Sequence, residues 1–66
     1  MNLRINGEEH DVPADLSLRD LIEWLKLTDG PVAIEQNGQI VPRAKHPVTK
    51  IVEGDVLEIV HFVGGG

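Results

Sequence analysis

The chain ends in three consecutive glycines, Gly64, Gly65 and Gly66, which have no side chains to contribute to chemistry. The groups that such a segment offers are backbone amides and the terminal carboxylate. Glycine loses more conformational freedom on folding than any other residue, so this run predicts neither helix nor strand. We therefore expect a flexible C-terminal tail over residues 64–66, narrow enough to enter a channel that no Cβ atom would fit. A frayed end or a glycine-rich linker has the same composition, and the glycines alone do not separate these alternatives.

The side chains that most often catalyse reactions or bind metals are sparse in this sequence. It has no cysteine, which excludes disulfides and thiolate ligands within it. Its histidines, His10, His46 and His61, lie far apart, whereas zinc needs three or four convergent ligands. Ser17 has no nucleophile motif around it and is better explained as a helix cap. We therefore expect no metal site, no bound cofactor and no enzymatic activity.

Composition predicts one small domain and narrows the classes of partner. The 66 residues are 41% apolar, enough for a single compact core. Eleven acidic against six basic residues give a net charge of −5, which argues against nucleic acid and fits a partner with a basic surface. No apolar run is long enough for a membrane span and no signal-peptide pattern is present, so we expect a cytoplasmic protein that does not contact membranes.

The elements that must present the tail begin with a hairpin and a helix. Apolar alternation predicts strands over residues 1–6 and 9–12, joined by Asn6-Gly7, a strong signal for a two-residue turn. Ser17 and Asp20 then favour a helix start. Trp24 is interpreted as a packing residue at the helix edge, and the helical region is expected to close at residues 29–31. The predicted helix has a single apolar stripe, formed by Leu18, Leu21, Ile22 and Leu25.

The second half of the chain predicts another hairpin, a polar connection and a long last strand. Strands are expected over residues 32–36 and 39–41 around Asn37-Gly38, and a polar connection over residues 43–49. After a turn at residues 53–55, the last strand is expected to cover residues 56–63 and to run directly into the glycines.

Alternation along this last strand separates a core face from a solvated face. Glu58 marks the solvated face, which also carries Val60 and Phe62 close to the tail. Exposed apolar clusters tend to mark contact sites. We therefore expect Val60, Phe62 and Glu58 to bind a partner.

The order of elements, hairpin, helix, hairpin, connection and final strand, predicts an α+β fold of the ubiquitin-like β-grasp type. One helix would pack on a small mixed sheet, with the final strand central and parallel to the first. The predicted division is a β-grasp domain over residues 1–63 and a tail over residues 64–66.

Two stretches resemble a known family. Residues 32–43 read VAIEQNGQIVPR and residues 53–66 read EGDVLEIVHFVGGG. In length and order the whole chain resembles the sulfur-carrier proteins of thiamine biosynthesis, a ThiS-like family within the ubiquitin-like superfamily. The C-terminal Gly-Gly of that family is matched by Gly65 and Gly66, and Gly64 lies beyond that minimum.

The resemblance implies a reaction cycle at Gly66. A ThiF-like adenylating enzyme would use ATP and magnesium to convert the Gly66 carboxylate into an acyl-adenylate. Sulfur from a donor such as a cysteine desulfurase would replace AMP and leave a thiocarboxylate, and thiazole synthase would take that sulfur for the thiazole ring of thiamine.

Three alternatives stay open at this point. A sulfur carrier for the molybdenum cofactor shares the fold and chemistry, although residues 40–43 favour the thiamine pathway. A ubiquitin-like modifier that is conjugated to lysines is the second alternative. A β-grasp interaction domain with an inert tail is the third.

Overall fold

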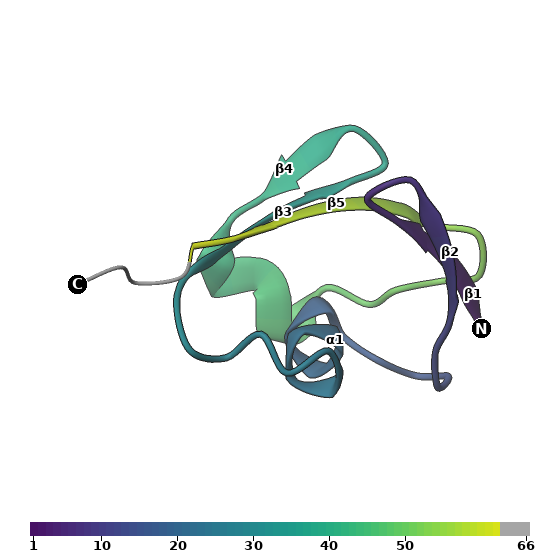
Figure 1. Ribbon diagram of the computed structural model, residues 1–66, viewed down its shortest axis with the longest axis horizontal. Coiled ribbons are helices and arrows are strands. Elements are labelled where there is room, and N and C mark those ends of the chain that lie inside the picture. The colour runs from purple at the N-terminus through teal and green to yellow at the C-terminus, as the bar shows by residue number, and fades with distance from the viewer. Residues whose placement is uncertain (63–66) are drawn as a thin grey trace.

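A computed structural model describes residues 1–62, which form a five-stranded sheet crossed by one α-helix (Figure 1). The strand order is β2-β1-β5-β3-β4, in which β1 and β5 are parallel and the other pairs are antiparallel. The predicted β-grasp fold, with the final strand central and parallel to the first, is therefore confirmed. The elements are β1 (Asn2–Ile5), β2 (Glu8–Asp11), α1 (Leu18–Trp24), β3 (Val32–Gln36), β4 (Gln39–Val41), the 3-10 helix η1 (Arg43–Val48) and β5 (Val56–His61).

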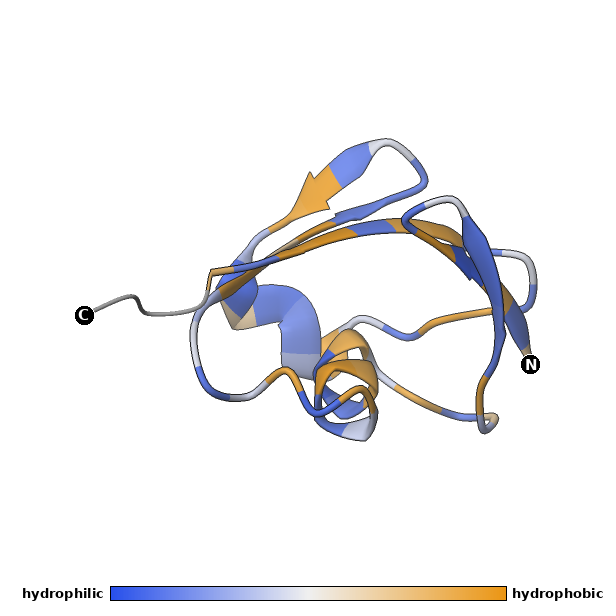
Figure 2. Cartoon of the chain, viewed as in Figure 1, coloured by the Kyte–Doolittle hydropathy of each residue, from blue (hydrophilic) through white to orange (hydrophobic). Residues whose placement is uncertain are grey.

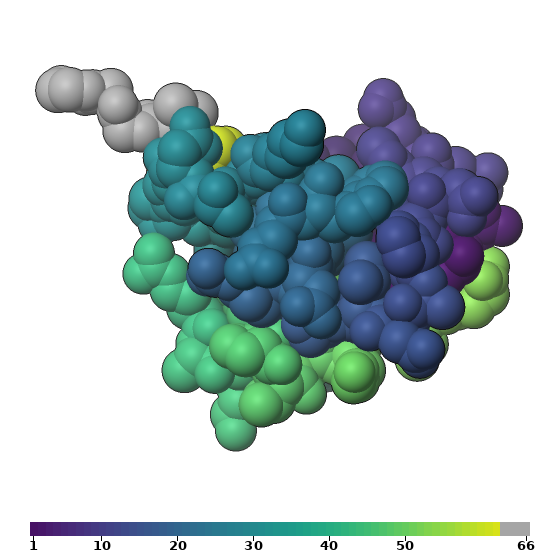
Figure 3. Space-filling view, turned by 90° about the horizontal axis from the view of Figure 1, so that it is seen from below, coloured from purple at the N-terminus to yellow at the C-terminus, as the bar shows by residue number. Residues whose placement is uncertain are grey.

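The core lies between the sheet and α1 and is formed by apolar residues of both layers. Figure 2 shows that the sheet and α1 both contain hydrophobic residues. Viewed from the helix side, α1 and η1 cover this face of the sheet (Figure 3). Alternate residues of β1 and β5 point inward, as the period of two requires. The buried apolar residues are Leu3, Ile5, Val12, Leu18, Leu21, Ile22, Ile34, Ile51, Leu57 and Ile59.

The start of α1 has the predicted cap. The Ser17 hydroxyl accepts a hydrogen bond from the Asp20 backbone N–H, and the Asp20 carboxylate accepts one from the Ser17 N–H, each at 3.0 Å. This reciprocal pair satisfies two of the backbone donors that a helix start leaves free. The Ser17 N–H also lowers the pKa of Asp20. The helical region ends earlier than expected, at Trp24, and Lys26 adopts a left-handed φ of 62°.

Both Asn-Gly pairs form the predicted two-residue turns. Asn6 and Gly7 have φ of 51° and 82°, and Asn37 and Gly38 have φ of 51° and 84°. Positive φ at both central positions defines a type I′ turn, whose twist matches that of the flanking strands.

The two turn asparagines also bond to β5, from opposite sides. Asn6 Nδ2 donates to the Ile59 carbonyl (3.0 Å), and the Ile59 N–H donates to Asn6 Oδ1 (2.8 Å). On the other side, the Val56 N–H donates to Asn37 Oδ1 (2.9 Å), and the Asn37 N–H donates to the Val56 carbonyl (2.8 Å). The Asn6 side chain thus continues the pairing of β5 past the end of β1.

Asp55, immediately before β5, joins this network as a buried carboxylate. It is 5% exposed and accepts hydrogen bonds from Gln36 Nε2, Asn37 Nδ2 and the Val52 N–H, each at 3.0 Å. Burial by itself raises the pKa of Asp55, but the hydrogen bonds from Asn37, Val52 and Gln36 outweigh burial and lower it.

Two expected segments differ from the structure. The polar connection over residues 43–49 was predicted without helix, but Arg43–Val48 forms η1. The His46 side chain of η1 is 3% exposed, and its Nε2 lies 3.1 Å from the Val41 carbonyl oxygen. Within the described residues, the last strand ends at His61, which pairs with Val32 at the start of β3. Val63 itself and the predicted tail at Gly64, Gly65 and Gly66 lie outside the described residues.

We predict that Asp55→Asn lowers the free energy of unfolding by about 1–3 kcal/mol at neutral pH, because an amide cannot accept from all three donors. The pKa of Asp55 is lower in the folded chain, so its stabilisation is present above its unfolded pKa, near pH 4. That stabilisation is lost as the pH falls through the folded-state pKa. Urea unfolding from pH 7 to pH 2 should therefore show the difference between the two proteins shrinking in acid. If the difference in unfolding free energy between the parent and Asp55→Asn stays constant from pH 7 to pH 2, the ionised Asp55 carboxylate is not the source of the stabilisation.

Candidate functional site

The predicted chemical group, the carboxylate of Gly66, lies outside the described residues, as do Gly64 and Gly65. What the structure describes is the strand that leads to them. β5 runs through the middle of the sheet, away from the N-terminal end of the molecule (Figure 1). Its last residue, His61, and the following Phe62 form the described part of the candidate site.

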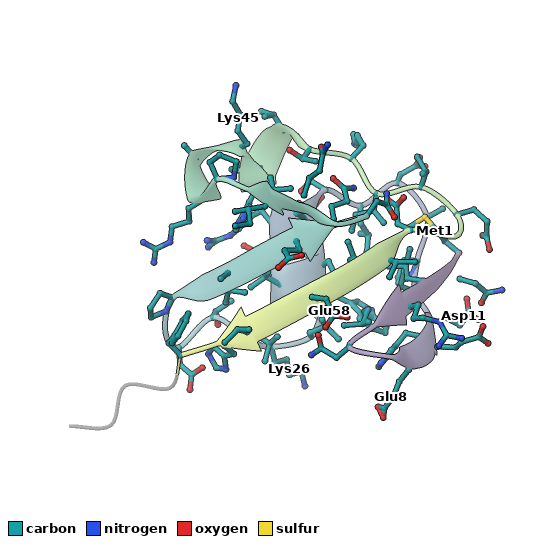
Figure 4. The ribbon with its side chains drawn as sticks, turned by 90° about the horizontal axis from the view of Figure 1, so that it is seen from above. Met1, Glu8, Asp11, Lys26, Lys45 and Glu58 are labelled. Atoms are coloured by element: carbon teal, nitrogen blue, oxygen red, sulfur yellow. The ribbon has the colours of Figure 1, made fainter. Side chains whose placement is uncertain are left out.

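The outer face of the sheet, on the side away from α1, carries the predicted contact residues. Val60 and Phe62 are each 53% exposed, and Glu58 projects from the middle of β5 on this face (Figure 4). The structure adds Ile40 of β4, which is 77% exposed. A shallow hollow on this face is lined by Ala33, Ile34, Glu35, Ile40, Glu58 and Val60.

Two carboxylates on this face lie directly opposite each other. Glu35 of β3 pairs in register with Glu58 of β5. Like charges at directly opposed positions destabilise a sheet. No described basic side chain lies within ion-pairing distance of either carboxylate. The outer face therefore combines an apolar surface with unneutralised negative charge.

Sequence reasoning predicted that Val60, Phe62 and Glu58 are exposed, from the period of two along the last strand, and the structure shows them exposed. It missed Glu35 and Ile40, because their position beside β5 depends on the register between β3, β4 and β5. The two Asn-Gly turns were the available signal, since a two-residue turn fixes the register of a hairpin.

The end of β5 also contacts the loop between α1 and β3. The Phe62 N–H donates to the Pro31 carbonyl at 2.9 Å. Asp29 Oδ1 lies 3.0 Å from His61 Nε2, and the His61 side chain is 17% exposed. These contacts continue to hold the chain just beyond the last residue that pairs with β3.

The described side chains do not form a metal-binding cluster. Within residues 1–62, no group of three or more histidine, aspartate or glutamate side chains is placed to hold a metal ion. His46 lies in η1 with its ring near the Val41 carbonyl, while His10 and His61 line one groove with Glu8. In the same part of the chain, α1 has seven residues, and no helix is long and apolar enough to cross a membrane.

Sequence comparison gives matches over nearly the whole chain. A sequence model of the ThiS family matches residues 3–66. The sulfur carrier protein ThiS of Bacillus subtilis (strain 168) is 34% identical over 65 residues, which cover 97% of this chain and 98% of that protein. A thiazole synthase of Paramagnetospirillum magneticum is 41% identical over all 66 residues. This chain spans 20% of the length of that thiazole synthase.

Structural comparison agrees with the sequence matches. The crystal structure of the thiamine biosynthesis protein ThiS from Geobacter metallireducens superposes with a TM-score of 0.83 at 33% identity, and the match covers all of both chains. Fold, length and sequence thus point to the same family. The chain belongs to the ThiS family.

Proposed function

We propose that this protein is a sulfur carrier of thiamine biosynthesis that acts through a thiocarboxylate on Gly66. The observation that carries the proposal is the match, over nearly the full length of both chains, with a protein named as the sulfur carrier ThiS. The fold agrees with a carrier role, because its central strand leads directly to the terminal residues.

The chemistry would be supplied by partners, with the chain as their substrate. A carboxylate is a poor acyl donor until a good leaving group is attached to it. A ThiF-like adenylating enzyme, using ATP and magnesium, would join the Gly66 carboxylate to AMP and release pyrophosphate. A sulfur nucleophile, supplied by a donor such as a cysteine desulfurase, would then displace AMP. The resulting thiocarboxylate, tethered to a folded protein, is delivered to its acceptor at high effective concentration.

We also propose thiazole synthase as the acceptor. Two relatives that are named thiazole synthases match this chain over all 66 residues, at 41% and 36% identity, although it spans only 20% of each. In those proteins a segment like this chain is part of one longer polypeptide. The presence of both segments in one polypeptide supports the proposal that this chain binds a separate thiazole synthase.

The partners would dock on the outer face of the sheet. Val60, Phe62 and Ile40 offer exposed apolar surface on this face, and Glu35 and Glu58 give that surface a negative charge. A partner with an apolar patch bordered by lysine or arginine fits both properties, and the net charge of −5 would steer its approach.

We predict that Phe62→Ala weakens binding to the adenylating enzyme or to thiazole synthase by about 1–3 kcal/mol, as expected for an aromatic anchor of an interface. The matched control is Val52→Ala, which shortens another exposed apolar side chain, 60% exposed, away from the end of β5. Isothermal titration calorimetry of both variants with each partner measures the effect. If Phe62→Ala binds both partners like the parent, Phe62 does not belong to the interface.

We predict that Glu58→Lys moves stability and binding in opposite directions. The lysine would face Glu35 across the strands, and replacing a like-charge pair with an opposite-charge pair should stabilise the sheet by about 0.2–1 kcal/mol. The same change should weaken binding to a basic partner, and the loss should shrink as salt is added. Thermal melts and binding titrations at two salt concentrations test both halves. Unchanged or tighter binding at low salt would remove Glu58 from the docking surface.

We predict that the chemistry requires Gly66 to be terminal and Gly65 to lack a side chain. One residue added after Gly66 moves the carboxylate by up to about 3.5 Å, enough to ruin its attack on the α-phosphate of ATP. Gly65→Val should fail because its branched side chain would meet the walls of a channel shaped for bare backbone. Both variants should melt like the parent, since neither change touches the core.

The measurement is intact mass after incubation with ATP, the adenylating enzyme and a sulfur source. The parent should gain the mass difference between one sulfur and one oxygen, and neither variant should gain it. An extended chain that acquires sulfur at the parent's rate, without prior trimming, would overturn the proposed function.

A further inference from the structure

The glycines in the described part of the chain are required for two different reasons. Gly7, Gly38 and Gly54 have φ of 82°, 84° and 86°, and a Cβ atom on any of them would have open space around it. Gly30, in the loop between α1 and β3, lies outside the left-handed range, but a Cβ atom there would collide with the carbonyl oxygen of Phe62. The first three are needed for backbone conformation, whereas Gly30 is needed for space.

The neighbours of Gly30 contact the same end of β5. Pro31 accepts the Phe62 N–H through its carbonyl at 2.9 Å. Asp29 places Oδ1 3.0 Å from His61 Nε2, a buried atom that forms no well-aligned hydrogen bond within residues 1–62. Three consecutive loop residues therefore lie against the chain where it leaves the sheet, and Pro31 bonds to it. We call residues 29–31 the exit clamp.

The exit clamp contacts β5 at the point where strand pairing stops. On one side of β5, the last described contact is the bond between the Asn6 side chain and Ile59. On the other side, pairing with β3 ends at Val32 and His61. Figure 1 shows the connection from α1 to β3 passing beside this end of β5. Among the contacts of the described backbone, the bond to Pro31 is the one that holds Phe62.

We propose that Gly30 is a positioning residue, which allows the exit clamp to set the direction in which the chain continues past Phe62. The Phe62 carbonyl against Gly30 belongs to the peptide group that joins Phe62 to Val63. A displacement of that carbonyl turns the peptide group and redirects everything attached to it. This inference rests on the proposed function, because the direction matters for presenting the Gly66 carboxylate to an adenylating enzyme.

The physical reason for an effect on rate is geometric. Adenylation depends on holding the attacking carboxylate oxygen in line with the bond that breaks at the α-phosphate of ATP, and a misplacement of about 1 Å costs on the order of 10²-fold in rate. The clamp acts on the last described peptide group before the glycines, so a rotation there changes the set of positions that the glycine tail can reach. A change at Gly30 acts on the backbone carbonyl of Phe62 and does not alter the side chains of Val60, Ile40, Glu35 and Glu58 on the outer face.

The experiment compares Gly30→Ala with Gly54→Ala, a control that makes the same chemical change away from the end of β5. Gly54→Ala strains a positive φ and lowers stability without contacting Phe62. The kcat and KM of adenylation are measured with the purified adenylating enzyme, ATP and each carrier variant. Amide chemical shifts of His61 and Phe62 report the geometry of the exit independently of activity.

We expect Gly30→Ala to shift the Phe62 amide signal and to lower kcat at least tenfold, with KM for the carrier changed less than about threefold. Gly54→Ala should keep the parental kcat. Asp29→Ala provides a second test of the clamp at low risk to folding, because the Asp29 side chain is 73% exposed. It should shift the His61 signal and lower kcat at least twofold.

The proposal is overturned if Gly30→Ala and Asp29→Ala retain the parental kcat, or if Gly54→Ala loses as much kcat as Gly30→Ala. The first result would show that the exit geometry does not matter, and the second would attribute the loss to stability. If the parent protein is not adenylated at all, the proposed function is refuted, and the proposed role of the clamp is refuted with it. An active parent with active clamp variants refutes the clamp alone.

Discussion

The structure depends on the bonds that two asparagine side chains form with the central strand. β1 turns away after Ile5, and the Asn6 amide then supplies the donor and acceptor that a further strand residue would have given to Ile59. Asn37 bonds to Val56 at the start of the same strand, and its Nδ2 also bonds to the buried carboxylate of Asp55. Each asparagine thus closes a tight turn and holds β5 in place, so both hairpins share one anchor.

This anchoring leaves the sheet with one packed face and one exposed face. One face of the sheet is used for the core, and the other carries exposed apolar side chains beside two opposed glutamates. The repulsion between Glu35 and Glu58 works against stability, and the fold tolerates it. Stability is supplied by the inner face and the ends of β5, which leaves the outer face available for recognition.

Local signals in the sequence were sufficient for the strands, the α-helix and their order. Each Asn-Gly pair predicted a turn, Ser17 and Asp20 predicted a helix start, and alternation predicted the faces of β5. The network around Asp55 and the space required at Gly30 were not predicted, because both depend on residues distant in sequence that meet only in the folded sheet.

Secondary structure was harder to predict where proline and polar residues dominate. The segment Arg43–Val48 contains Pro47 and was expected to be irregular, yet it forms η1 over the buried His46. Short 3-10 turns need few residues and leave little periodicity, so this segment lacked a pattern that sequence reasoning can use.

The central position of the last strand has a consequence for how the chain folds. The bond between Asn6 and Ile59 joins residues 53 positions apart, so a loop of nearly the whole domain must close before it forms. The hairpins and the helix need only neighbours in sequence and can form earlier, whereas β5 enters between them late. Until it does, β1 and β3 both present open edges, and such edges pair readily with other chains. The interval before β5 docks is therefore the stage at which this protein is most exposed to aggregation.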